Sequence, residues 1–217
     1  MRVVILGAGG HGQVVADILL RSREAGAGAV PVGFLDDDPA RLGKRVLNLP
    51  VLGTLAQLAQ IERDAVVVAI GDNRLRQKIF MTLRAQGEHL HTAIHPRATI
   101  APDVTIGPGA MVCAGVVVNT GSTIGANTIL NTGATIDHHN QIGDHCHVAP
   151  GAHLGGEVTI GDGTLVGIGA TVLPRMAVGR WCVVGAGAVV HKDVADRCVA
   201  VGVPARQVSK IANNDET

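Results

Sequence analysis

Aromatic side chains are almost absent from this chain of 217 residues. They make up 1% of it, with no tyrosine and with Trp181 as the single tryptophan. Apolar residues nevertheless account for 47%. The core must therefore be built from valine, isoleucine, leucine and alanine, which suits a narrow interior with no room for rings.

Three further absences exclude whole classes of function. The four cysteines (Cys113, Cys146, Cys182 and Cys198) form no CxxC pair, which favours reduced thiols in a cytoplasmic protein over a disulfide framework. The formal net charge is zero and there is no basic run, so we expect no nucleic-acid partner. No apolar run approaches the length of a membrane span, and the short strand-like start breaks at Gly7, too early for a signal peptide.

Residues 1–93 alternate short apolar runs with amphipathic segments. The runs RVVILG, VPVGFLDDD and DAVVVAIG predict strands, and HGQVVADILLRSREAG and DNRLRQKIFMTLRAQG predict helices. The first helix would bury Val14, Val15, Ile18 and Leu19, and Asp72 or Asn73 would cap the second. This order of elements predicts a small α/β domain of Rossmann-like βαβ units around a parallel sheet.

The second half follows a different period, because an aliphatic residue recurs at every sixth position. The series is Ile100, Ile106, Val112, Val118, Ile124, Leu130, Ile136, Ile142, Val148, Leu154, Ile160, Val166, Val172, Val178, Val184 and Val190. A six-residue period predicts short strands joined by tight corners, with the aliphatic residue pointing inward on each. We expect a parallel β-helix over residues 94–208 and a C-terminal tail over 209–217.

The stretch GAGGHG resembles a phosphate-binding loop. Gly7, Gly9 and Gly12 fit the GxGxxG pattern, follow a predicted strand and open a predicted helix. Such a loop lets a phosphate approach the backbone N–H groups. Asp36 and Asp37 lie near the spacing of a ribose-binding acid. Because the α/β portion is only about half of a dinucleotide fold, a nucleoside-diphosphate ligand fits better than NAD; a turn that only aids packing is the alternative.

Taken in order, several motifs resemble one family. GAGGHG, FLDDD, AIGDN, IHPRATI, IDHHNQIGDHCHVAPGAHLGG and GVPAR are similar to segments of the hexapeptide-repeat nucleotide-sugar N-acetyltransferases and the related sialic-acid O-acetyltransferases. Within this family, the sequence most resembles the perosamine N-acetyltransferases. The resemblance implies a left-handed parallel β-helix, acetyl-CoA as co-substrate and no metal.

The resemblance also implies roles for individual residues. Gly9, Gly10, His11, Asp36, Asp37 and Gly71 would bind the nucleotide sugar. His147, Gly156, Ile168 and Ala186 would line the acetyl-CoA channel, and GVPAR would cover its end. His138 would be the general base, with His139 beside it. A neutral imidazole can take the proton that a sugar amine must lose before it attacks a thioester.

One position departs from the family pattern. Related enzymes often carry a carboxylate next to the base, whereas this chain has His139 there. Asp137 precedes His138 but would project differently. Either another carboxylate orients His138, or the amine enters already neutral and binding supplies most of the rate.

Three rival functions compete with the sugar N-acetyltransferase. The histidine cluster, with His138, His145 and His147, is also compatible with a zinc enzyme of the gamma-carbonic-anhydrase type. A nucleotide-sugar sensor would keep GAGGHG but would not need His138. A sialic-acid-type O-acetyltransferase would use a hydroxyl acceptor.

We predict an enzyme that acetylates the 4-amino group of a nucleotide-linked 4-amino-4,6-dideoxy sugar in bacterial surface glycan synthesis, such as lipopolysaccharide O-antigen synthesis. GDP-perosamine is the first expected substrate and a UDP-linked amino sugar the second. The resemblance further implies a cytoplasmic homotrimer in which the cofactor groove lies between subunits.

Overall fold

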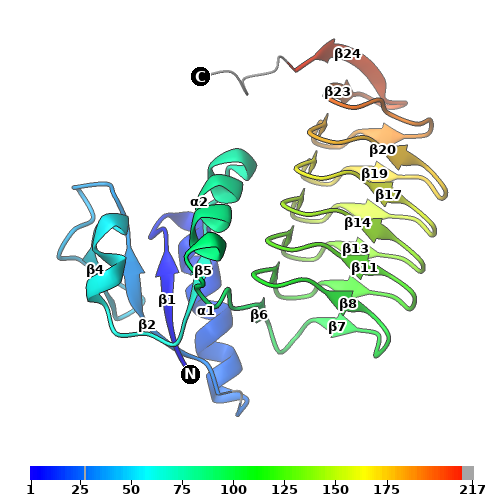
Figure 1. Cartoon of the computed structure of the whole chain (residues 1–217). Coiled ribbons are helices and arrows are strands. Elements are labelled where there is room, and N and C mark those ends of the chain that lie inside the picture. The colour runs from blue at the N-terminus through cyan, green and yellow to red at the C-terminus, as the bar shows by residue number, and fades with distance from the viewer. Residues whose placement is uncertain (27, 212–217) are drawn as a thin grey trace.

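The computed structural model describes residues 1–26 and 28–211. It confirms the predicted order of a small α/β domain followed by a parallel β-helix, which stand side by side in Figure 1. Of the predicted tail, Ser209 and Lys210 belong to the last strand, and residues 212–217 lie outside the described part.

The α/β domain is a five-stranded sheet in the order β3-β4-β2-β1-β5. Its elements are β1 (Arg2–Leu6), α1 (Gly10–Glu24), β2 (Val30–Leu35), β3 (Arg45–Val46), β4 (Leu49–Gly53), the 3-10 helix η1 (Leu55–Gln60), β5 (Ala65–Val68) and α2 (Asn73–Ala85). β1 pairs in parallel with β2 and β5, so the carboxyl ends of these strands meet at one edge. Ligands of open parallel sheets bind at that edge.

Both predicted helices are present. α1 buries Val15, Ile18 and Leu19 but leaves Val14 exposed. Asp72 is the N-cap of α2, where its side chain accepts a hydrogen bond from the Leu75 N–H. The β3–β4 hairpin and η1 were not predicted from the sequence.

The β-helix is built from two-residue strands that pair with strands one coil away, eighteen residues on, as Asn119 and Asp137 illustrate. They form three sheets, parallel throughout except for the terminal β23–β24 pair, which we name by the order in which a coil meets them. Face 1 contains β6 (Ala93–Ile94), β9 (Met111–Val112), β12 (Ile129–Leu130), β15 (His147–Val148), β18 (Leu165–Val166), β21 (Val183–Val184), β23 (Cys198–Val201) and β24 (Arg206–Lys210).

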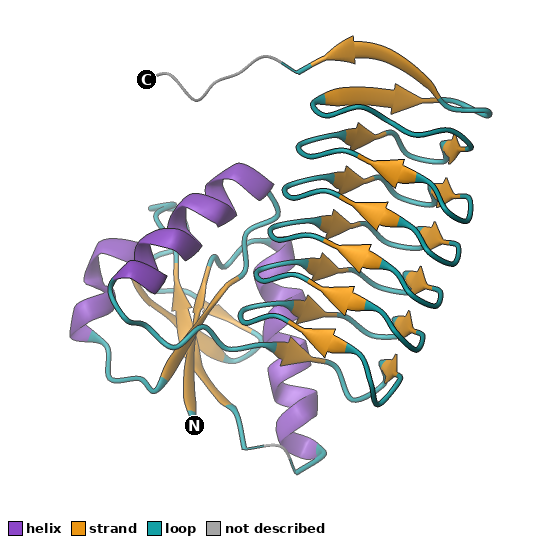
Figure 2. Cartoon of the chain, turned by 45° about the vertical axis from the view of Figure 1, so that its right-hand side comes forward, coloured by secondary structure: helices purple, strands orange, loops and turns teal. Residues whose placement is uncertain are grey.

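Faces 2 and 3 complete each coil. Face 2 contains β7 (Thr99–Ile100), β10 (Val117–Val118), β13 (Thr135–Ile136), β16 (His153–Leu154), β19 (Thr171–Val172) and β22 (Val189–Val190). Face 3 contains β8 (Thr105–Ile106), β11 (Thr123–Ile124), β14 (Gln141–Ile142), β17 (Thr159–Ile160) and β20 (Ala177–Val178). Figure 2 shows the stacked coils edge-on.

The corners explain the six-residue period. From Gly109 to Gly187, every sixth residue has a positive φ of about 54° to 71°, which turns the chain from one face to the next. Glycine adopts this conformation at no steric cost, whereas other residues are strained there. The aliphatic residue of each hexad then points inward; Ile136 and Val148, for example, are fully buried.

The α/β domain packs against face 1 and reaches the corners on both of its sides, whereas β23 and β24 extend beyond it in Figure 1. α2 packs on the corner between faces 3 and 1, where Phe80 meets the ring of His145. α1 contacts β6 and, near the corner between faces 1 and 2, shares a cavity with Ala114 and Thr132. The corner between faces 2 and 3 is therefore the one that lies opposite the α/β domain.

Candidate active site

The predicted phosphate loop forms the turn between β1 and α1. Gly7 has a φ of +105°, and a side chain on Gly12 would collide with the Gly7 carbonyl oxygen. Glycine is therefore required at both positions for the helix to begin so close to the strand. The result is a helix N-terminus whose N–H groups face the carboxyl edge of the sheet.

A cavity of about 470 Å³ opens in front of this loop. All six residues predicted to bind the nucleotide sugar line it, namely Gly9, Gly10, His11, Asp36, Asp37 and Gly71. Leu55, Leu75 and Ile79 add apolar walls. The structure thus brings together segments that are far apart in the sequence, although their role in binding remains a prediction.

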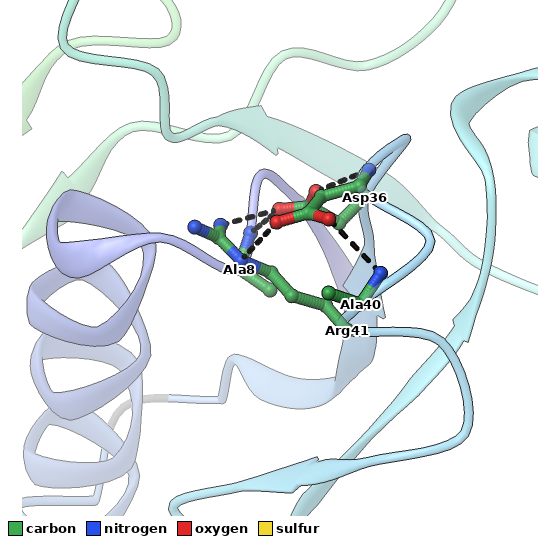
Figure 3. Close-up of polar contacts among 5 residues, drawn as sticks. Ala8, Asp36, Ala40 and Arg41 are labelled. Atoms are coloured by element: carbon green, nitrogen blue, oxygen red, sulfur yellow. Dashed lines mark hydrogen bonds and ion pairs between the residues drawn. The ribbon is translucent and has the colours of Figure 1, made fainter.

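Asp36 is held at the end of β2 by three donors, as Figure 3 shows. Its carboxylate accepts hydrogen bonds from Ala8 N–H at 2.7 Å, Asp38 N–H at 2.9 Å and the Arg41 guanidinium at 2.9 Å. Burial alone would raise the pKa of Asp36, but these donors lower it below its usual value. Asp36 therefore stays ionised and fixes the loop geometry.

Arg41 lies over the glycine loop and was not predicted from the sequence. A side chain on Gly9 would come within 3.1 Å of its guanidinium. An arginine placed there can contact a diphosphate on the helix N-terminus. The only sequence signal was its position five residues after Asp36, which did not distinguish it from Lys44 or Arg45.

A second unpredicted residue, Arg76, joins the two domains. It is fully buried on α2 and donates to the carbonyl oxygens of Ile70, Gly71, Asn127, His145 and Cys146 and to the side chain of Asn73. Burial lowers the pKa of Arg76 to about 10, so it remains a cation. In the sequence it looked like any charged residue of an amphipathic helix.

Two predicted histidines meet beside Arg76, one from each domain. The rings of His11 and His147 lie 6.3 Å apart. Burial and then the charge of Arg76 lower the pKa of His11 to about 4 and that of His147 to about 3. Both imidazoles are therefore neutral at physiological pH. His147 contacts Asn131 at 3.1 Å, whereas His11 Nε2 is buried without a partner among the described residues.

His138 and His139 occupy the corner between faces 2 and 3, following β13. Their Nδ1 atoms are 3.1 Å apart and their rings are nearly perpendicular, at 76°. Gly156 lies one coil away, and a side chain on it would come within 2.5 Å of the His138 ring. The predicted Gly156 is therefore next to the predicted base.

The remaining predicted cofactor residues lie on a different corner. Ile168 follows β18 and Ala186 follows β21, so both are on the corner between faces 1 and 2. Ile168 is 62% exposed, unusual for an isoleucine. His147 lies on face 1 under the α/β domain. Within one chain, His138 therefore does not meet the nucleotide cavity, because they lie on opposite sides of the β-helix.

In residues 1–26 and 28–211, no group of three or more His, Cys, Asp or Glu side chains is arranged to hold a metal ion. Over the same ranges, no helix is long and apolar enough to cross a bilayer.

The family model of the PglD N-terminal domain matches residues 2–83. The comparison with curated proteins gives no match.

Solved structures match nearly the whole chain. A histidine-to-asparagine variant of perosamine N-acetyltransferase from Caulobacter crescentus, in complex with CoA and GDP-perosamine, is 40% identical, with a TM-score of 0.88, over 97% of this chain and 98% of that one. The acetyltransferase domain of PglB from Neisseria gonorrhoeae, in complex with acetyl coenzyme A, is 37% identical, with a TM-score of 0.89, over 95% and 98%. WeeI from Acinetobacter baumannii is 26% identical, with a TM-score of 0.83, over 96% and 100%.

Proposed function

Since this chain belongs to the hexapeptide-repeat nucleotide-sugar N-acetyltransferases, we propose that it transfers the acetyl group of acetyl-CoA to the 4-amino group of a nucleotide-linked 4-amino-4,6-dideoxy sugar. GDP-perosamine is the first candidate acceptor and a UDP-linked amino sugar the second. The observation that carries the proposal is the cavity lined by all six expected sugar-nucleotide residues, on a chain 40% identical to a perosamine N-acetyltransferase.

The α/β domain, residues 1–93, holds the nucleotide sugar in this proposal. The diphosphate lies on the N-terminus of α1 beneath Arg41, where the backbone N–H groups of Gly9 and Gly10 and a guanidinium offset its charge. Asp37 faces the same cavity and is placed to contact the ribose or base. His11, neutral because of burial and Arg76, offers to the ligand its Nε2 atom, which has no partner within residues 1–26 and 28–211.

The β-helix, residues 94–208, supplies the chemistry. His138 takes a proton from the sugar amine as the nitrogen bonds to the thioester carbonyl carbon, and the carbon–sulfur bond then breaks to release CoA. A base within reach of the amine contributes about 10²–10⁴-fold to such a reaction. Gly156, Ile168 and Ala186 line the channel for acetyl-CoA, and His147 lies where the two substrates meet.

The opposed positions of the cavity and His138 call for a second subunit. Face 2 lies between the corner that carries His138 and the corner that carries Ile168 and Ala186. If three chains pack with face 2 toward a common axis, the His138 corner of one meets the Ile168 corner of the next. This is a closed heterologous contact. We therefore propose a homotrimer with three composite active sites.

The substrates suggest where the enzyme works. Acetyl-CoA and nucleotide sugars are made and used in the bacterial cytoplasm, and the buried free cysteines suit a reducing compartment. We propose a cytoplasmic enzyme that prepares a sugar for a surface glycan such as the lipopolysaccharide O-antigen.

The test is acetyl transfer measured as free thiol release, with GDP- and UDP-linked 4-amino sugars and their 4-hydroxyl analogues. Release with one amino sugar and none with its hydroxyl analogue supports the proposal and names the substrate. Release with hydroxyl analogues alone points to an O-acetyltransferase. No thiol release with any of these substrates, together with zinc in the purified protein, overturns the proposal in favour of a metal enzyme.

A matched variant tests the base. His138→Asn should lower kcat at least 100-fold and leave CoA affinity, measured by calorimetry, within about twofold. Unchanged turnover would remove His138 from the mechanism.

A further inference from the structure

The imidazole of His138 contacts the imidazole of His139 rather than a carboxylate. The two Nδ1 atoms are 3.1 Å apart, which is hydrogen-bonding distance. One ring nitrogen must carry the proton and the other must offer its lone pair. The direction of this bond decides which nitrogen of His138 is free to act as a base.

The proposed function fixes that direction. A base that accepts a proton at Nε2 must already carry one at Nδ1. His138 therefore donates from Nδ1, and His139 accepts at its own Nδ1. The proton of a neutral His139 is then on Nε2, on the opposite edge of the ring.

That opposite edge of His139 lies over Gly121. An added side chain on Gly121 would come within 2.6 Å of His139 Cδ2 and 2.9 Å of Nε2. At the same residue, the Asp103 carboxylate accepts hydrogen bonds from Gly121 N–H at 2.9 Å and from the Thr120 hydroxyl at 2.7 Å. The carboxylate and the Nε2 edge of His139 thus converge on one glycine.

Asp103 is held as an anion at this position. The Thr120 hydroxyl, the Gly121 N–H and, as a smaller influence, the charge of His139 lower its pKa. A fixed negative charge near Nε2 favours the tautomer of His139 that has its proton there. That tautomer is the one that can accept from His138.

The backbone conformation of His139 determines how its side chain can be removed without destabilising the fold. Its φ of +57° is in the left-handed region, where glycine stands at many equivalent corners, including Gly121. A histidine there costs about 1 kcal/mol relative to glycine. Because Glu157 and Arg175 adopt the same conformation on this corner, the strain does not by itself mark function, but replacing His139 by glycine relieves it.

We propose that Asp103 and His139 are positioning residues that hold His138 with Nδ1 protonated and Nε2 free for the sugar amine. The pair replaces a single orienting carboxylate with an aspartate–histidine couple, following the general rule that a catalytic base is oriented by a further group. This inference rests on the proposed role of His138 as base.

Other charged groups surround the corner and need to be distinguished from the pair. The Asp137 carboxylate accepts from the His138 backbone N–H at 2.8 Å and from the Asn119 amide. Glu157, one coil away, pairs with Arg175 at 3.5 Å. Neither carboxylate has a hydrogen bond to the His138 ring among the described residues. After the hydrogen bonds from Asn119 and the His138 N–H, however, the charge of His138 contributes to the lowered pKa of Asp137, so Asp137 also acts on the base through space.

The test uses His139→Gly, which removes the acceptor and relieves the strained backbone. We expect Tm to stay the same or rise, while kcat/KM falls 10- to 100-fold. His139→Asn should retain more activity, because asparagine tolerates the left-handed conformation and its amide oxygen can accept from His138. Arg175→Gly is the control, because Arg175 has the same left-handed backbone conformation on this corner. It should change Tm by as much as His139→Gly does and leave kcat/KM unaltered.

The pH profile of kcat/KM separates positioning from a structural role. Asp103→Asn should shift its acidic limb to lower pH, since loss of a nearby negative charge lowers the pKa of the base. Wild-type activity and an unmoved limb in both His139→Gly and Asp103→Asn would overturn the inference while leaving His138 as base. Full activity of His138→Ala would instead overturn the proposed function itself.

Discussion

Gly156 shows how one missing side chain can control a candidate active site. It stands one coil above His138, and a side chain there would come within 2.5 Å of the imidazole. Its φ is not in the left-handed region, so the backbone itself would accept alanine. Glycine is therefore required at position 156 because of the neighbouring His138 ring and not because of the backbone conformation of the turn.

Gly156→Ala should therefore reduce activity without unfolding the protein. The methyl group forces the His138 ring out of its position, and a displacement of about 1 Å at the reacting groups can cost roughly 100-fold in rate. Thermal unfolding and steady-state kinetics of the same preparation check this. A variant with wild-type kcat would show that the ring has room to move, contrary to the packing described here.

Residues could be predicted from the sequence where their role depends on a local pattern of neighbouring residues. The sixteen aliphatic hexad positions follow directly from coil geometry, and the glycine loop follows from the close contact of Gly12 with Gly7. Arg41 and Arg76 could not be predicted in this way, because their roles depend on contacts between segments far apart in the chain. For the same reason, no local signal placed His147 under α1 and Ile168 on another corner.

At the scale of elements, the contact between α1 and β15 joins the domains through uncharged histidines. His11 lies in the first turn of α1 and His147 begins β15. Neighbouring outward positions on face 1 are Ile129 and Leu165, so His147 replaces an aliphatic residue in an apolar column. Burial beside the cation Arg76 keeps both rings neutral.

This contact predicts a loss of stability on acidification. The folded pKa values, about 4 for His11 and about 3 for His147, lie below the ordinary 6.5. Their contribution is therefore complete above pH 6.5 and is lost as the pH falls toward 4, because the unfolded chain takes up the protons first. While a histidine is protonated in the unfolded chain and neutral in the folded protein, it lowers the free energy of unfolding by about 1.4 kcal/mol for each pH unit of acidification.

Thermal unfolding between pH 7 and pH 4.5 measures the effect. His147→Leu, which continues the aliphatic column, should make Tm less dependent on pH, whereas His89→Leu at an exposed position should not. Equal slopes in the wild type and both variants would show that the buried pair does not control the acid response.

At the scale of the whole molecule, the proposed function depends on which face of the β-helix packs against the other subunits of the trimer. Face 1 is occupied by the α/β domain. Face 2 presents four small side chains that are partly buried even in one chain, Thr135, Thr171, Val117 and Val189, together with the exposed Thr99 and His153. Face 3 presents the exposed Gln141, Thr159 and Ala177. Face 2 is thus the surface suited to close packing around a three-fold axis.

Two threonine-to-arginine variants separate these faces. Thr171→Arg introduces a charge on face 2 and should shift the protein from trimer to monomer in analytical ultracentrifugation, with loss of acetyl transfer. Thr159→Arg on face 3 should remain trimeric and active. A trimer that survives Thr171→Arg would place the contact on another face and require a different composite site.

The pairing of residues eighteen apart also constrains how such a chain can change in length. A single inserted residue within a strand would turn every following hexad, so that aliphatic residues reached the surface and polar ones the interior. Gain or loss of a whole coil preserves the alignment, and a loop added at a corner leaves the strands in place. Relatives of this protein are therefore expected to differ in length by complete coils or by corner loops, and the distance between the nucleotide cavity and the end of the β-helix to vary in steps of one coil.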